Sequence, residues 1–129
     1  MNRVLNEHFV FMKPKNIVSG DFYWLAEKDK KIVVTVADCT GHGVPGAFMS
    51  MLGIAFLNEI VNKTNKIAPN VILDQLRQNI IESLHQEYGV RGSKDGMDMA
   101  LCIFNNDSNQ MLFSGSYNSV IVCRDNQIH

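Results

Sequence analysis

Asp38 stands just ahead of three glycines, in the stretch VADCTGHGVPGAFMSM at residues 36–51. Gly41, Gly43 and Gly46 form the pattern G-x-G-x-x-G between an apolar run typical of a strand and a run with helical spacing. Glycines ahead of a helix can bind phosphate through N–H groups and the helix dipole. A dinucleotide site would require a parallel strand after one helix, whereas a second helix is expected here. The charge of Asp38 beside a pyrophosphate also argues against a nucleotide.

A second acid, Asp21, suggests another use for Asp38. The aromatic and β-branched runs at 21–26 and 31–38 predict a β-hairpin. A turn centred on residues 29–30 then places Asp21 opposite Asp38. Directly opposed side chains have Cβ atoms about 4.5–5.5 Å apart, a separation at which like charges are destabilising.

The repulsion between two such carboxylates must be offset. One solution is a raised pKa with a shared proton. Another is a bound divalent cation, for which carboxylate oxygens and a backbone carbonyl are suitable ligands. Two cations about 3.5–4 Å apart, bridged by a carboxylate, can deprotonate a water and polarise a phosphoryl oxygen. Spacing alone leaves equally open that Asp21 is a turn acid after Gly20 and that Asp38 caps the following helix.

Three further side chains are candidates for the same chemistry. His42 lies four residues past Asp38 and could donate a proton to a leaving oxygen, although a turn residue bonded to nearby backbone is the commoner role. Asp95 and Asp98 flank the start of a strand, where either could join an extra metal ion. Asp95 is interpreted as a solvated loop residue, and the role of Asp98 is left open.

The apolar runs predict strands in antiparallel groups. The short apolar run at 8–14, which ends at Pro14, is expected to be the first strand. The predicted hairpin follows it. Toward the C-terminus three short strands are expected at 97–106, 110–119 and 120–128, the first two as a hairpin.

Two consecutive helices are expected between these strand groups. After the glycines, six apolar residues at three-and-four spacing predict a helix that buries this face: Val44, Phe48, Met51, Leu52, Ala55 and Phe56. A second helix with the same period is expected from Pro69 to near Gly89, on Leu73, Leu76, Ile80, Leu84 and Tyr88. The order β-β-β-α-α-β-β-β indicates an α+β fold rather than alternating βαβ units.

Composition narrows the class of protein. The 129 residues are 46% hydrophobic, which is enough for the core of one domain. The net charge of -1 comes from scattered charges, so no basic stripe indicates nucleic acid or an anionic membrane surface. No leader pattern and no apolar run of roughly 20 residues is evident. Cys39, Cys102 and Cys123 lack metal-site spacing, which favours ordinary thiols over zinc and fits a reducing cytoplasm.

Three blocks of the sequence resemble one protein family. KPKNIVSGDFYW at 13–24, VADCTGHGVPGAFMSMLG at 36–53 and GMDMALCIF at 96–104 are similar to the bacterial SpoIIE-type serine phosphatases. These form a branch of the metal-dependent PP2C-like (PPM) superfamily. The family fold is a pair of antiparallel β-sheets stacked face to face, with helices outside, in α-β-β-α layers. Residues 1–129 are expected to be a single partial domain, the N-terminal portion of that fold.

The resemblance implies roles for individual residues. Asp21 is expected as the first metal-binding acid, and Asp38 as the acid that bridges two Mn²⁺ or Mg²⁺ ions. The backbone carbonyl of Cys39 is the companion ligand. A later acidic motif supplies further ligands in the family, and nothing after Asp98 resembles it. About the last third of such a domain is therefore expected to be absent.

The resemblance also implies a function. It indicates a cytoplasmic phosphatase that hydrolyses phosphoserine or phosphothreonine on a regulatory protein by metal-activated water, in bacterial signal transduction. In such proteins the substrate is typically the phosphorylated antagonist of an anti-sigma factor, and a sensor or receiver module precedes the domain. The alternative is a non-catalytic phosphatase-like module that binds a partner or assembles through exposed strands, for example as a homodimer.

Overall fold

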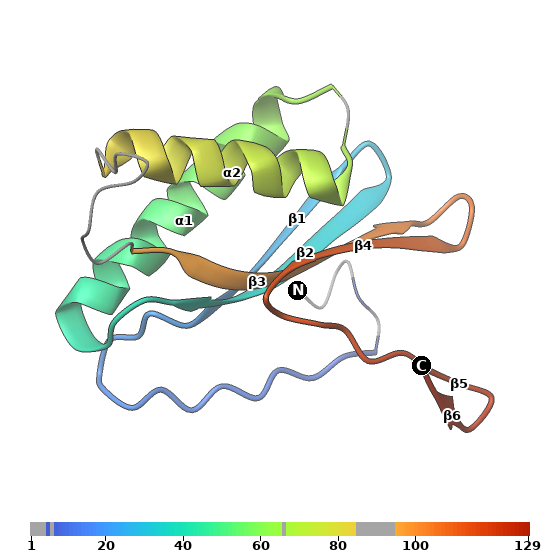
Figure 1. The fold of residues 1–129 in the computed structure, drawn as a ribbon. Coiled ribbons are helices and arrows are strands. Elements are labelled where there is room, and N and C mark those ends of the chain that lie inside the picture. The colour runs from blue at the N-terminus through green and yellow to red at the C-terminus, as the bar shows by residue number, and fades with distance from the viewer. Residues whose placement is uncertain (1–4, 6, 66, 85–94) are drawn as a thin grey trace.

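The computed structural model describes residues 5, 7–65, 67–84 and 95–129. Its elements, in chain order, are β1 (Phe22–Lys28), β2 (Lys31–Cys39), α1 (Gly43–Lys63), α2 (Pro69–Ser83), β3 (Met97–Asn105), β4 (Gln110–Ser116), β5 (Cys123–Arg124) and β6 (Gln127–Ile128). The first four strands form one antiparallel sheet in the order β1-β2-β3-β4, and both helices cover the same face of it (Figure 1). The predicted α+β class is confirmed.

The β1–β2 hairpin has the predicted register. Asp29 and Lys30 form the turn with φ of 52° and 60°, the two positive values that a two-residue type I′ turn requires. Trp24 therefore pairs with Thr35, and Phe22 with Ala37 is the last pair of the ladder. The position just beyond that pair places Asp21 next to Asp38.

The core lies between the helices and the sheet. Alternate residues of β1, β2 and β3 face the helices and are buried, as the period of two in a strand requires. The largest fully buried side chains come from both layers: Leu57, Ile72, Leu76, Met99, Leu101, Ile103, Val33, Val61 and Thr35. In α2 the predicted stripe is confirmed at Leu76 and Ile80, which are buried, whereas Tyr88 and Gly89 lie outside the described residues.

The predicted buried face of α1 is wrong. Val44, Phe48 and Met51 are 61%, 66% and 66% exposed. The buried face instead consists of Gly46, Met49, Ser50, Gly53, Leu57, Ile60 and Val61. Because α1 is apolar on several sides, hydrophobic spacing does not identify one face. The helix turns its smallest residues toward the sheet, where they allow close approach.

Within the described residues, α1 is the one helix whose length and apolar composition would suffice to cross a membrane. Core helices of soluble proteins can have the same two properties. In the structure α1 packs on β1 and β2.

Two predicted strands differ from the structure. Residues 8–14 form no strand, and Phe9 and Phe11 are 91% and 84% exposed. A run with strand composition becomes a strand only where a neighbouring strand offers ladder hydrogen bonds, and the ladders of the sheet are made by β1 to β4. Residues 120–128 contain the small hairpin β5–β6 instead of one strand, because Asp125 and Asn126 adopt the positive φ of a turn.

Lys28 joins the hairpin to the end of α1. Its Nζ donates hydrogen bonds to the carbonyl oxygens of Val61, Asn62 and Thr64 at 2.8, 2.9 and 2.7 Å. Carbonyls at a helix C-terminus lack partners within the helix, and a positive charge there is favourable.

Replacing Lys28 by Met should therefore lower the free energy of unfolding by about 1–2 kcal/mol, because the methionine keeps the apolar stem and removes the donors. Urea denaturation of the variant measures this. The exposed Lys15, changed to Met, serves as the control and should change stability by less than about 0.5 kcal/mol. Equal losses in the two variants would contradict a specific role for Lys28.

Candidate metal centre

Three glycines bring the start of β1, the end of β2 and the start of α1 into backbone contact. A Cβ atom on Gly46 would lie 2.6 Å from the carbonyl oxygen of Gly41 and 3.1 Å from the Cα atom of Gly20. A Cβ atom on Gly20 would lie 3.0 Å from that same oxygen. Gly41 itself has a φ of +88°, which favours glycine. Of the G-x-G-x-x-G pattern, Gly46 is therefore explained by close packing, and Gly41 and Gly43, with φ of +88° and +64°, by backbone conformation.

Hydrogen bonds hold the segment before β1 in this position. The buried Ser50 of α1 donates from Oγ to the carbonyl oxygen of Ser19 at 3.0 Å. The backbone N–H of Asp21 donates to the Oγ of Ser19, also at 3.0 Å. Ser19 is thus bonded to α1 through Ser50, and Asp21 is bonded to Ser19 across Gly20.

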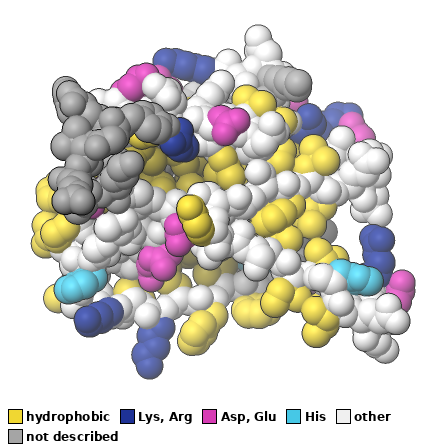
Figure 2. All heavy atoms as spheres, viewed as in Figure 1, with side chains coloured by type: hydrophobic (Ala, Val, Ile, Leu, Met, Phe, Trp, Pro, Cys, Tyr) yellow, Lys and Arg dark blue, Asp and Glu magenta, His cyan; other side chains and the backbone are white. Residues whose placement is uncertain are grey.

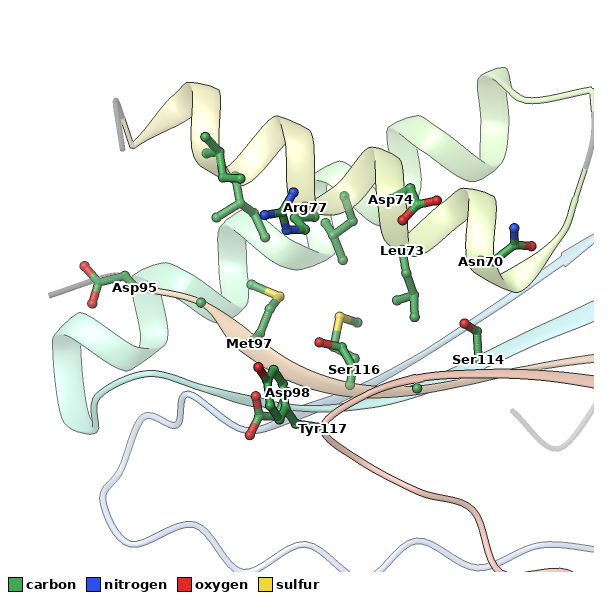
Figure 3. A pocket seen from close by; sticks show the side chains of 16 residues that line it. Asn70, Leu73, Asp74, Arg77, Asp95, Met97, Asp98, Ser114, Ser116 and Tyr117 are labelled. Carbon is green, nitrogen blue, oxygen red and sulfur yellow. The ribbon is translucent and has the colours of Figure 1, made fainter. Parts of the chain in front are cut away.

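The sheet brings together three acids at the ends of adjacent strands. Asp38 is paired with Asp98 of β3, and Asp21 lies beside Asp38 on the other side. Strand alternation turns Asp38 and Asp98 to the face opposite the helices, since their neighbours Ala37 and Met99 are buried on the helix side. Figure 3 shows the carboxylate of Asp98 pointing away from the helices.

The charges of this cluster shift the pKa of two groups. Desolvation raises the pKa of Asp38, and it is raised further by the hydrogen bond that protonated Asp38 donates to the Asp21 carboxylate and by the negative charge of Asp21. Burial, followed by the charges of Asp38 and Asp21, raises the pKa of the Cys39 thiol to about 12. The Cys39 side chain is buried on the helix side of β2, because it alternates with the exposed Asp38 along the strand. Any ligand role of Cys39 therefore falls to its carbonyl oxygen, which lies against Gly20, 3.2 Å from the position of a Cβ atom there.

A cleft of about 510 Å³ adjoins the acids, and His42 contributes to its wall. The lining residues are Asp38, Cys39, Thr40, Gly41, His42, Gly96, Met97 and Asp98. His42 is the N-cap of α1 without a side-chain capping bond, and its Nδ1 lies 3.5 Å from the Nδ2 of Asn16. Asp95 precedes β3 and lies apart from Asp98 (Figure 3). The structure thus brings His42 and Asp98 to the cleft of Asp38.

The donor set fits part of a site for a hard divalent cation. Asp21 and Asp38 provide adjacent carboxylates, which Mg²⁺ and Mn²⁺ prefer. Among the described residues, no three His, Cys, Asp or Glu side chains are arranged to hold one ion. A cation bound by these acids would complete its coordination with water or with other oxygen ligands.

Asp98 is the residue whose position the sequence did not reveal. Two helices separate β2 from β3 along the chain, so no turn fixes their register. The one signal was the acid at the start of an apolar strand, matched by Asp38 at the end of another.

The antiparallel sheet covered by two helices, with acids at one end of its strands, defines a PP2C-like domain. The sequence matches the family of stage II sporulation protein E (SpoIIE) over residues 28–127, and the chain belongs to this family. The predicted SpoIIE-type, PP2C-like identity is confirmed. No curated protein matched the sequence.

Two solved structures are similar in fold. The SiaA-PP2C domain of Pseudomonas aeruginosa is 30% identical, with a TM-score of 0.69 over 84% of this chain and 42% of that chain. A structure described as the bacterial stressosome, a modular system adapted to control secondary messenger signalling, is 22% identical, with a TM-score of 0.50 over 72% of this chain and 41% of that chain. The chain therefore spans about two fifths of the length of either structure.

Gly46→Ala tests the close crossing of the backbone segments. The new Cβ would meet the carbonyl of Gly41, so stability should fall by about 1–3 kcal/mol, even though alanine is the better helix former by about 1 kcal/mol. Gly96→Ala is the matched control, because a Cβ atom there would meet nothing within 4 Å. Chemical denaturation of both variants decides the point. A stabilised Gly46→Ala protein would show that the crossing tolerates a side chain.

Asp38→Asn tests the repulsion between the carboxylates. In EDTA at neutral pH this variant should be more stable than the wild type by a few tenths of a kcal/mol, because the acids are exposed and screened. The raised pKa of Asp38 means that the wild type loses stability as the pH rises from 3.8 through the folded-state pKa. The difference should therefore vanish at low pH and grow toward neutrality. A pH-independent difference in thermal denaturation would refute this explanation.

Proposed function

We propose that this chain is part of a Mn²⁺- or Mg²⁺-dependent protein phosphatase that hydrolyses phosphoserine or phosphothreonine on a regulatory protein. The observation that carries this proposal is the placement of Asp21 beside Asp38 by the glycine crossing. Asp38 lines the cleft together with Asp98, and the adjacent carboxylates of Asp21 and Asp38 are suited to a divalent cation. Membership in the SpoIIE family supports the same chemistry.

In this proposal Asp21 and Asp38 hold the cation, and the Cys39 carbonyl is a further ligand. When bound, the cation supplies the positive charge that activates a water and neutralises the phosphoryl oxygens. The water oxygen forms a bond to phosphorus while the bond from phosphorus to the serine oxygen breaks. The serine oxygen then takes up a proton, and no covalent enzyme intermediate is formed.

His42 is the proposed donor of that proton. The group that gives a proton to an oxygen is the imidazolium form of His42, in which both ring nitrogens carry a proton. An Nε2–H group at the wall of the cleft can face a leaving oxygen.

We further propose a signalling partner for the domain. The similar structures are a PP2C domain and a stressosome signalling assembly. A phosphorylated antagonist of an anti-sigma factor is the substrate type that the family resemblance favours, in the cytoplasm and under a sensor or receiver module.

A second candidate, a non-catalytic phosphatase-like binding or assembly module, is favoured by one observation. No three suitable side chains in the described part of the chain converge on one ion. In this alternative the exposed apolar side chains, such as Phe48 of α1, would contact a partner protein or a second copy.

Mn²⁺ titration separates these functions. In the phosphatase, Mn²⁺ should raise the melting temperature of the wild type, because a ligand that binds only the folded state stabilises it. Mn²⁺ should also start phosphate release from a phosphoserine peptide. Asp38→Asn should lose both effects because it removes a ligand.

Asp107→Asn is the matched control for this experiment. Asp107 is an exposed acid in the β3–β4 turn, paired with Lys30 at 3.3 Å. Both Mn²⁺ effects should persist in this variant. Turnover that survives Asp38→Asn would refute the metal assignment, and Mn²⁺ binding without turnover would favour the non-catalytic module.

A further inference from the structure

A second cavity, of about 620 Å³, lies between α2 and the ends of β3 and β4 (Figure 3). Leu73 and Ile80 of α2 line it from one side, and Met97 of β3 from the other. Ser114 and Ser116 of β4 close a third side. In the view of Figure 1, Figure 2 shows hydrophobic side chains in a hollow at the centre of this face, with acidic side chains at its border. We refer to this cavity as the α2–β3 groove.

One edge of β3 is unpaired along this groove. On the β2 side the ladder continues to the pair Cys39 and Met97. On the β4 side it ends at Ala100 and Gly115, followed by one isolated bridge from Met99 to Tyr117. Among the described residues, Met97 and Asp98 thus have no ladder partner on the β4 side. Their backbone edge is available to an added strand.

The turn after β4 keeps this edge open. A Cβ atom on Gly115 would lie 2.1 Å from the carbonyl oxygen of Asn118, so the chain folds back closely on itself there. Tyr117 has a φ of 59°, the left-handed conformation of a reversal. The chain therefore leaves β3 after the bridge between Tyr117 and Met99, and does not continue alongside Met97 and Asp98.

The groove is continuous with the cleft of the acids. Gly96, Met97 and Asp98 line both cavities. Because alternate residues of a strand face opposite sides, Met97 faces the helices and Asp98 the acids (Figure 3). A chain paired with this edge would reach from the α2–β3 groove to the acidic cleft within a few residues, at about 3.3 Å per residue.

We propose that the α2–β3 groove binds the segment of the phosphoprotein that flanks its phosphoserine, in an extended conformation paired with the edge of β3. Main-chain hydrogen bonds to an open strand edge and one pocket for a side chain are the features of strand addition. The pocket between Leu73, Ile80 and Met97 takes an apolar side chain of that segment. The identity of the phosphorylated residue rests on the proposed function.

Binding of synthetic peptides tests this proposal without requiring catalysis. The probe is a fluorescein-labelled phosphoserine peptide with an alanine background, in which one leucine is moved from position to position on either side of the phosphoserine. Fluorescence anisotropy should give a Kd about tenfold lower for one leucine position than for the others, since a buried leucine contributes that much or more. Equal Kd values at all positions would overturn the proposal.

Groove-filling variants locate the binding site. Ser114→Phe places a ring in the groove and should weaken binding of the preferred peptide about tenfold, to the level of the all-alanine peptide. Ser116→Phe provides a second variant in case the first does not fold, as judged by circular dichroism. Ser108→Phe, in the exposed turn of the same β3–β4 hairpin, is the matched control and should bind as the wild type does. Unchanged affinity in both groove variants would overturn the proposal.

Turnover of p-nitrophenyl phosphate separates failure of this inference from failure of the proposed function. This substrate has no flanking residues and needs only the acidic cleft. Mn²⁺-dependent turnover without any leucine preference among peptides would uphold the phosphatase and overturn the groove. Leucine-dependent peptide binding without turnover of either substrate would uphold the groove and overturn the phosphatase.

Discussion

The close crossing of Gly20, Gly41 and Gly46 is the constraint on which the candidate metal centre depends. The carbonyl oxygen of Gly41 occupies the space where Gly46 would carry a side chain. A Cβ atom on Gly20 or Gly46 would push the start of β1 away from the start of α1. Asp21 directly follows Gly20, so a shift of the start of β1 would also move Asp21 away from Asp38. The glycines and the acids are therefore one structural feature.

This crossing concentrates negative charge, and the surrounding fold must offset the repulsion. Asp38 has a raised pKa, in part because of the neighbouring charge of Asp21. The compensation comes from elsewhere, since the sheet and both helices share one buried core. The burial of apolar side chains on the opposite face of the same strands thus stabilises the sheet and offsets the repulsion between the acids. Sites with such internal strain are often functional.

The sequence determines local features of this fold more clearly than distant ones. The β1–β2 register followed from the residues at its turn, and the proximity of Asp21 to Asp38 followed from the register. The buried face of α1 did not follow, because its small residues are invisible to hydrophobic spacing, as at Gly46 and Gly53. Nor did the pairing of Asp98, since its register is set by tertiary contacts across two helices. The run at 8–14 has strand composition but no ladder partner.

The two edges of β3 differ in how firmly they are fixed. Pairing with β2 extends from Lys31 and Asn105 to Cys39 and Met97, so the position of Asp98 beside Asp38 is set by the whole length of the strand. Pairing with β4 stops short of Asp98, where the chain turns away. The strand thus has one edge that holds an acid in place and another that remains available. A single strand can therefore align a bound peptide with the acids, because β3 would pair with the peptide along one edge and holds Asp98 beside Asp38 along the other.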